Sequence, residues 1–179
     1  MREHGKFKNT WWQYSRPQNL TEFECKKISI PYMSDKPQAT WDNDCLYHNT
    51  KIHSISFKED VKYNPYYILA LINSKLFNFY ISATGTVFRG WFLVFSPNFI
   101  NPFPIKELDL DNKQDKEIHD KLVNLVDNII DLNKKLSSEK NPNTIEMLNM
   151  RIQAVDKAIN KIVYALYGLN DEEIKIIEG

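Results

Sequence analysis

Glycine is scarce in this chain of 179 residues: there are five, at positions 5, 85, 90, 168 and 179. Neither the G-x-G-x-x-G fingerprint of dinucleotide-binding folds nor the G-x-x-x-x-G-K-[ST] phosphate-binding loop can be assembled from those positions. Both motifs need glycines at fixed spacing, because the backbone must approach a phosphate closely. The sequence therefore excludes a Rossmann-type dinucleotide site and a P-loop.

Cysteines and long apolar runs are also in short supply. The two cysteines, Cys25 and Cys45, do not make a disulfide framework. The longest nearly uncharged stretch, residues 91–104, contains three prolines and is too short to span a bilayer. The start of the sequence lacks a basic segment followed by an apolar one, so we expect a cytoplasmic protein.

The net charge of zero hides an asymmetry between two parts of the chain. Residues 1–106 carry 13 lysines and arginines against 8 aspartates and glutamates, whereas residues 107–179 carry 10 against 15. Nearly all of the aromatic residues also lie in the first part. We therefore expect two differently built pieces, 1–106 and 107–179, that are joined near residue 106.

The second piece shows the periodicity of two long helices. Apolar residues recur at alternating steps of three and four along two segments, which is a heptad pattern. The first series is Ile118, Leu122, Leu125, Ile129, Leu132 and Leu136, and the second is Ile145, Leu148, Ile152, Val155, Ile159, Ile162 and Leu166. The polar segment between them contains Pro142, which prevents one continuous helix.

Capping residues predict where these helices begin and end. Asn143, with Glu146 three residues later, resembles a capping box for the second helix, and Gly168 is a natural helix stop. Asn170 followed by Glu173 predicts one more capped turn. We expect an antiparallel, coiled-coil-like hairpin that serves as a spacer or joins two copies as a homodimer, and that offers no pocket.

The first piece is expected to be mixed α/β. Asn64 and Pro65 favour a helix start, and apolar residues continue that helix to Gly85. Segments rich in β-branched and aromatic residues predict strands at 27–32, 51–57 and 87–95. The expected fold class of the whole chain is α+β: at least five short strands around one central helix, followed by the helical hairpin.

Two strings resemble catalytic motifs but lack essential parts. N-P-F-P at 101–104 resembles the N-P-P-[YF] motif of amino-methyltransferases, yet an aromatic residue stands where the second proline belongs. We interpret it as a rigid turn between the two pieces. Glu24 and Lys26 form the E-x-K end of a nuclease signature, but before Glu22 the only acidic residue is Glu3, so an upstream metal partner is lacking.

A zinc site is a third candidate. Cys45, His48 and His53, together with Cys25, have the side chains that zinc prefers. Their spacing matches no familiar zinc finger, and Cys25 would have to be brought in by the fold. Ordinary thiols and surface histidines are the favoured interpretation.

Several segments of the chain resemble one known family. They are W-Q-Y-S-R-P at 12–17, K-I-S-I-P-Y at 27–32, Y-Y-I-L-A-L-I-N-S-K-L at 66–76, P-F-P-I at 102–105 and I-V-Y-A-L-Y-G-L at 162–169. Together they resemble the TaqI-like C-terminal specificity domain, which is the target recognition domain of adenine-N6 DNA methyltransferases and of fused type IIG restriction–modification enzymes. The most specific element is Leu-Asn-Ser-Lys after an aromatic pair, with Ile72 in place of the leucine here.

The resemblance implies a division of labour. In such enzymes a separate N-terminal domain binds S-adenosylmethionine and transfers the methyl group, with Mg²⁺ where the parent also cleaves DNA. This chain would then be non-catalytic and hold no cofactor or metal. Its partners would be double-stranded DNA and the methyltransferase domain of the same polypeptide or of a partner subunit. The family also implies a bacterial or archaeal source, and the hairpin resembles the helical spacer of type I specificity subunits.

Charge and aromatic context, rather than the family, nominate the residues that contact DNA. The candidates are Arg16, Lys26, Lys27, Lys36 and Arg89, with Tyr14, Tyr32 and Trp91 as secondary candidates. Arg89 has the best case, because Gly90 beside it permits close backbone approach. We expect Arg89→Ala to weaken binding to a specific site more than to random DNA.

Two other functional classes stay open. The first is a protein-interaction module that docks through its hairpin and does not bind DNA. The second is a metal-dependent nuclease that uses Glu24 and Lys26, for which cleavage would depend on magnesium and be lost in Glu24→Ala.

Overall fold

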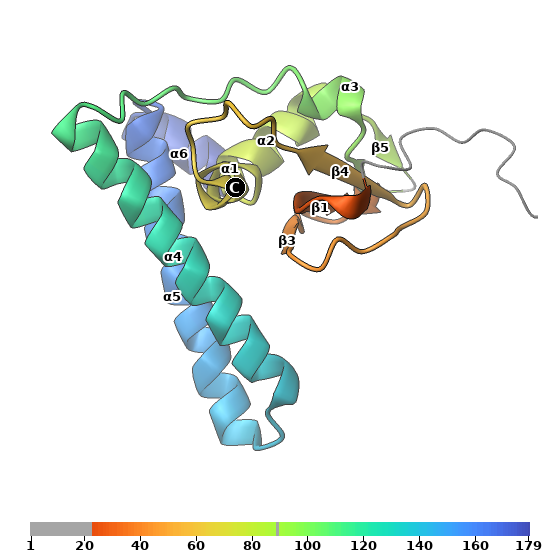
Figure 1. Ribbon diagram of the computed structural model, residues 1–179. Helices are drawn as coiled ribbons and strands as arrows, with labels where there is room; N and C mark the ends of the chain where they lie inside the picture. The colour runs from red at the N-terminus through yellow and green to blue at the C-terminus, as the bar shows by residue number, and fades with distance from the viewer. Residues whose placement is uncertain (1–22, 89) are drawn as a thin grey trace, which may run out of the picture.

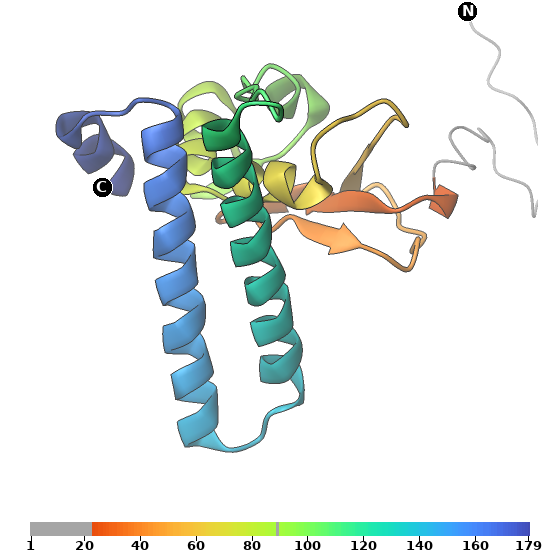
Figure 2. The same ribbon diagram turned by 60° about the vertical axis from the view of Figure 1, so that its left-hand side comes forward.

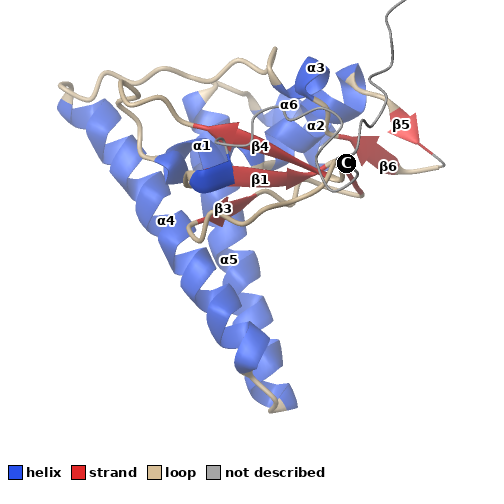
Figure 3. Ribbon diagram, turned by 45° about the vertical axis from the view of Figure 1, so that its right-hand side comes forward, coloured by secondary structure: helices blue, strands red, loops and turns tan. Residues whose placement is uncertain are grey.

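The computed structural model describes residues 23–88 and 90–179, which form an α/β part and a long two-helix arm (Figure 1). Within these residues, six short strands form two antiparallel sheets of three strands each (Figure 3). The strands are β1 (Lys27–Pro31), β2 (Met33–Ser34), β3 (Thr40–Asp42), β4 (Ile52–Ser56), β5 (Val87–Phe88) and β6 (Phe92–Val94). The first sheet has the order β3-β1-β4 and the second β2-β6-β5. The expectation of at least five short strands is therefore confirmed.

Strand β1 is central to the first sheet, and its sequence alternates as a half-buried strand should. Ile28 and Ile30 are fully buried, whereas Ser29 between them is only partly covered. Ser29 lies opposite Thr40 of β3 and Ser54 of β4, so the outer face of this sheet carries a row of hydroxyl groups.

The central helix predicted for residues 65–84 is two helices, α1 (Pro65–Ile72) and α2 (Lys75–Thr84). Asn64 caps α1 as expected, by accepting a hydrogen bond from the Tyr66 amide. The break falls at Asn73 and Ser74: the Ser74 hydroxyl accepts a hydrogen bond from the amide of Phe77 and starts α2. Apolar spacing alone did not reveal this break, because both helices turn apolar residues toward the same core.

The strand predicted for residues 87–95 is a hairpin, in which β5 and β6 pair with each other. Its turn includes Gly90, whose φ of 100° lies in the left-handed region that favours glycine. The glycine in this apolar segment was therefore a turn signal.

The arm consists of α4 (Lys113–Ser138) and α5 (Pro142–Leu166), which lie side by side and antiparallel (Figure 2). Both predicted helices are confirmed, and α5 ends before Gly168, which has a φ of 69°. The predicted cap of α5 is wrong: Asn141, not Asn143, accepts the capping hydrogen bond, and Pro142 takes the first helical position. Beyond the arm, α6 (Asp171–Glu178) begins with the expected capping box of Asn170 and Glu173.

One hydrophobic core runs through both parts of the chain. It joins Ile28 and Phe77 of the α/β part to Leu122 of α4 and Val163 of α5, all of them fully buried. The short helix α3 (Pro97–Ile100) leads into the junction between the parts. The predicted boundary near residue 106 therefore separates two kinds of sequence but not two cores.

Aromatic residues hold the junction from both sides. Phe103 is buried and packs edge-on against Phe77 and Tyr80, with ring centroids 4.9 and 5.1 Å away. The Tyr67 hydroxyl donates to the Lys106 carbonyl at 2.6 Å, and that of Tyr167 on the arm side donates to the Pro104 carbonyl at the same distance. The N-P-F-P string is thus part of a fixed turn. Among the residues that the structure describes, no helix is both long and apolar enough to cross a bilayer.

Candidate nucleic-acid interface

The sequence-predicted DNA contacts do not share one environment. Arg16, Tyr14 and Arg89 lie outside the described residues. Of the others, Lys26 and Lys36 are exposed, Tyr32 is half-buried and Lys27 is fully buried. Trp91 in the β5–β6 turn is 71% exposed.

Lys27 is not a surface cation, so the expectation that it offers its charge to a phosphate is corrected. Its ammonium Nζ lies 2.9 Å from Oδ2 of Asp42, which is also buried. The same ammonium donates to the carbonyls of Phe23 at 3.0 Å and Cys25 at 3.4 Å. A buried lysine needs such partners, because an isolated charge in an apolar interior is very costly.

Tyr32 joins the two sheets. Its amide donates to the Lys51 carbonyl at 2.7 Å, and its carbonyl accepts from the Phe95 amide at 2.8 Å. Its ring packs edge-on against His53 with centroids 5.5 Å apart. These contacts give Tyr32 a structural role at the end of β1 opposite to Lys26.

Lys36 lies toward the arm. Partial desolvation raises the pKa of Asp156 on α5, and the nearby positive charge of Lys36 opposes that rise. Lys26, by contrast, precedes β1 at the end of the first sheet where Asp42 lies. The described candidates are therefore spread over the α/β part rather than gathered in one patch.

The β5–β6 hairpin exposes more apolar surface than the sequence suggested. Val87, Phe88 and Phe92 are 51, 45 and 42% exposed, next to the more exposed Trp91. A hairpin with one buried face normally carries polar residues on the other. The available signal was the lack of that alternation in T-V-F-R-G-W-F, which the interpretation of residues 87–95 as a single strand did not use.

Sequence reasoning considered the loop of residues 43–51, which connects β3 to β4, only as a source of candidate zinc ligands. Leu46 and Tyr47 are each 62% exposed in it. The Tyr47 ring stacks on Phe23, with centroids 5.1 Å apart, and its hydroxyl donates to Glu24 Oε1 at 3.0 Å. A loop of nine residues with two exposed large side chains is a frequent site of function.

The metal-dependent alternatives find no support in this region. Within residues 23–88 and 90–179, no group of three or more His, Cys, Asp or Glu side chains is arranged to hold a metal ion. His48 instead contacts the Ser54 hydroxyl and stacks edge-on against Phe23. The candidate zinc ligands Cys25, Cys45, His48 and His53, all of them described, are thus not assembled into such a group.

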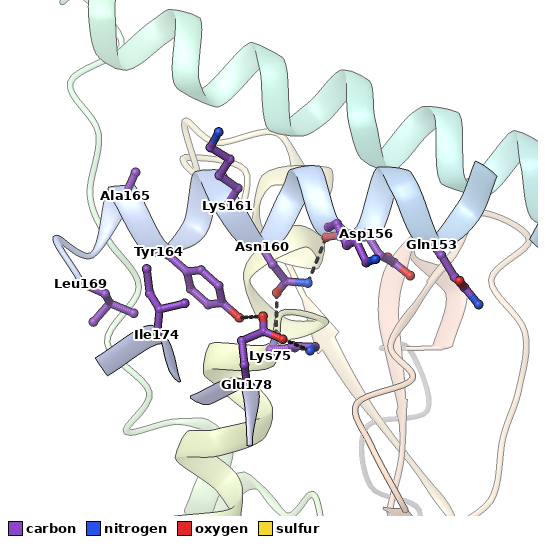
Figure 4. Close-up of a pocket in the computed structure, with 11 residues that line it drawn as sticks. Lys75, Gln153, Asp156, Asn160, Lys161, Tyr164, Ala165, Leu169, Ile174 and Glu178 are labelled. Carbon is purple, nitrogen blue, oxygen red and sulfur yellow. Dashed lines mark hydrogen bonds and ion pairs between the residues drawn. The ribbon is translucent and has the colours of Figure 1, made fainter. Parts of the chain in front are cut away.

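A cavity lies where α5, α6 and the start of α2 meet, which the expectation of a hairpin without a pocket did not foresee (Figure 4). Its volume is about 670 Å³. Glu178 of α6 accepts a hydrogen bond from the Tyr164 hydroxyl at 2.7 Å and pairs with the Lys75 ammonium. Hydrogen bonds from Lys75 and Tyr164 and the charge of Lys75 hold the pKa of Glu178 below its usual range. These contacts fasten α6 to α2 and α5.

The Asn-Ser-Lys string is a junction of the fold. Asn73 accepts from the Ala39 amide at 2.8 Å and donates to the Ala39 carbonyl at 2.9 Å. Ser74 caps α2, and the amide of Lys75 donates to Asn160 Oδ1 on α5 at 2.8 Å. The three residues connect the loop before β3, the helices of the α/β part and the arm.

Residues 2–105 match the TaqI-like C-terminal specificity domain. The match covers more than half of the chain, and the chain therefore belongs to this family of specificity domains.

Curated relatives are enzymes of type II restriction–modification systems. Type II restriction enzyme and methyltransferase RM.Eco57I of Escherichia coli is 31% identical over 121 residues, covering 63% of this chain and 12% of that protein. Type II methyltransferase M.HindII of Haemophilus influenzae is 28% identical over 156 residues, covering 84% of this chain and 29% of that protein. Type II methyltransferase M.HincII of Haemophilus influenzae is 28% identical over 150 residues, covering 80% of this chain and 28% of that protein. The chain thus spans less than a third of the length of each relative.

Proposed function

We propose that this chain reads the sequence of double-stranded DNA for a type II restriction–modification methyltransferase. The family match over residues 2–105 carries the proposal, and three relatives named as type II restriction–modification enzymes support it. In this proposal the chain holds the duplex while the target adenine leaves the base stack. Binding of S-adenosylmethionine, and of Mg²⁺ in a parent that also cleaves DNA, belongs to a catalytic domain in the same polypeptide or a partner subunit.

The distribution of charge supports contact through the α/β part. The excess of basic over acidic residues lies in residues 1–106, whereas residues 107–179 are net acidic. Phosphates attract the first and repel the second, so the duplex would lie against the sheets with the arm directed away. Lys26 has an exposed side chain for phosphates, and Trp91 offers an apolar face to sugars or bases.

Direct binding of duplex DNA by the purified chain tests this function. Fluorescence anisotropy over a salt series should show affinity that falls steeply as salt rises, because binding releases counterions from phosphates. Lys26→Ala should weaken binding to every duplex and reduce the salt slope by about one. Trp91→Ala should weaken binding by about tenfold.

Lys140→Ala provides the matched control. Lys140 is an exposed lysine at the far end of the arm, so its removal changes the net charge equally but should leave the affinity unchanged. A wild-type chain without salt-dependent affinity for duplex DNA would contradict the proposed function.

A second candidate function rests on the far half of the arm. Met147 and Met150 of α5 are 44 and 60% exposed there, and methionine is enriched at protein interfaces. They favour an arm that contacts a second copy of the chain or the catalytic subunit. Light scattering tests whether the partner is a second copy of the chain. If the wild type is a dimer that pairs through Met147 and Met150, Met150→Lys should dissociate it into monomers.

A further inference from the structure

Asp42 connects the buried ammonium of Lys27 to the loop of residues 43–51. The carboxylate that pairs with Lys27 also accepts hydrogen bonds from two loop amides, that of Asp44 at 3.1 Å and that of Leu46 at 2.8 Å. Burial alone would raise the pKa of Asp42, but the hydrogen bonds from Lys27 and the two amides lower it below its usual value. The carboxylate is therefore charged at neutral pH and bonded on both sides.

The two amides flank a strained residue. Cys45, between them, has a φ of 55°, in the left-handed region that is unfavourable for residues other than glycine, asparagine and aspartate. Such a conformation persists only where its surroundings impose it. Here the surroundings include the Asp42 carboxylate, whose own place is fixed by Lys27.

The loop so held presents a defined surface. Tyr47 keeps a 62% exposed side chain although its ring stacks on Phe23 and its hydroxyl is bonded to Glu24. The Phe23 carbonyl in turn accepts a hydrogen bond from Lys27, so one ammonium orders both sides of the aromatic stack. Exposed Asn43 adds a side-chain amide, a group suited to reading base edges, whereas the Asn49 side-chain oxygen accepts a hydrogen bond from the Lys51 amide at 2.9 Å.

We propose that the loop of residues 43–51 is a DNA-reading element and that Lys27 is its positioning residue, acting through Asp42. This inference rests on the proposed function. Duplex DNA is the occupant we propose. Exposed Lys26, next to Lys27, and exposed Lys51, at the far end of the loop and at the opposite end of β1, would contact phosphates on either side of the loop. An element that reads bases must be rigid, because a wrong base is rejected only when the reading groups cannot move to suit it.

The test compares specific with non-specific affinity. The wild-type chain first selects its site from a randomised duplex library, and affinities for that site and a scrambled duplex are then measured. Lys27→Met should lower the ratio of the two affinities by about tenfold, the effect of one lost base contact. The double variant Lys27→Met/Asp42→Leu should show the same loss, although its melting temperature should lie within about 5 °C of wild type because no unpaired charge stays buried.

Lys26→Met is the matched control, since it removes an exposed lysine one residue away. It should weaken both affinities equally and leave their ratio unchanged. A folded double variant that keeps the wild-type ratio of specific to non-specific affinity would overturn the positioning role of Lys27. An equal loss of specific and non-specific affinity in that variant would overturn it as well. Either result would leave the proposed function standing. A wild-type chain that selects no sequence would overturn both. If Lys27→Met alone does not fold, the double variant decides the question.

Discussion

The arm and the α/β part differ in how well a local sequence pattern predicts their contacts. In the arm, the spacing of apolar residues determines which side chains meet, and α4 and α5 form where the heptads place them. In the α/β part, no periodic pattern in the sequence marks the decisive contacts. Lys27 meets Asp42, and the Tyr67 hydroxyl reaches the carbonyl of Lys106.

This difference teaches that the same residue type has to be interpreted differently in the two regions. An exposed lysine of α4 such as Lys116 pairs with Asp120 one turn away, which the sequence shows directly. Lys27 has the same charge but is buried by a fold that brings β1 and β3 together. Surface chemistry is therefore easy to infer from the arm and hard to infer from the sheets.

The largest effect is expected where the two regions share their core. Leu122→Ala should cost about 4 kcal/mol, because Leu122 is fully buried in the core common to both. Leu132→Ala, in the part of α4 outside that core, should cost about 2 kcal/mol. Chemical denaturation followed by circular dichroism and by tryptophan fluorescence measures both, since all four tryptophans lie before residue 106.

The two signals distinguish one cooperative unit from two. Because the core is continuous, we expect both signals to change together in the wild type and to shift together in Leu122→Ala. Helix loss and fluorescence change at clearly different denaturant concentrations in the wild type would show instead that residues 1–106 and 107–179 are independent domains.

A smaller, pH-dependent effect on stability is expected at the buried ion pair of Lys27 and Asp42 in the α/β part. Asp42→Asn should cost about 3 kcal/mol at pH 7, because it leaves the Lys27 ammonium buried without a counter-charge. The pKa of Asp42 is lowered by folding, so its contribution is complete above its unfolded value of about 3.9 and is lost as the pH falls through the lower folded value.

Urea denaturation between pH 7 and pH 2 measures this dependence. The difference in unfolding free energy between wild type and Asp42→Asn should stay constant down to about pH 5 and shrink below it. Asp120→Asn is the control on the arm, because Asp120 also has a lowered pKa but is partly exposed, and its substitution should change stability far less. A difference at Asp42 that grows toward low pH would contradict the assigned charge state.

The sequence predicted much of the fold and little of the surface. Both arm helices, the start of α1, the strands β1 and β4 and the stop at Gly168 followed from periodicity and local capping chemistry. The break at Ser74 did not, because a serine cap inside an apolar pattern is a weak signal until Asn73 is seen bonded to Ala39. Helix breaks fixed by long-range hydrogen bonds are not visible in local spacing.

The candidate interface was less predictable for the same reason. Charge and aromatic character nominated Lys26, Lys36 and Trp91, which the structure leaves exposed, but also Lys27, which it buries. Tyr47 was missed because nothing local marks the loop after β3 as held by Asp42. Whether a cation faces solvent depends on which acidic side chain the fold places beside it.

The smallest effect tests the local chemistry of the arm at the one cap that was misassigned. Asn141→Ala should destabilise the chain by about 1 kcal/mol, because the Asn141 side chain accepts the hydrogen bond from the Asn143 amide at 3.0 Å that starts α5. Asn143→Ala keeps that amide and places a better helix former in the first turn, so stability should be unchanged or slightly higher. Thermal unfolding followed by circular dichroism measures the stability of both variants. A larger loss of stability for Asn143→Ala than for Asn141→Ala would support instead the capping box of Asn143 and Glu146 that the sequence predicted. The pair of variants thus shows whether a cap followed by proline at the first helical position outweighs a capping-box pattern that starts one residue after that proline.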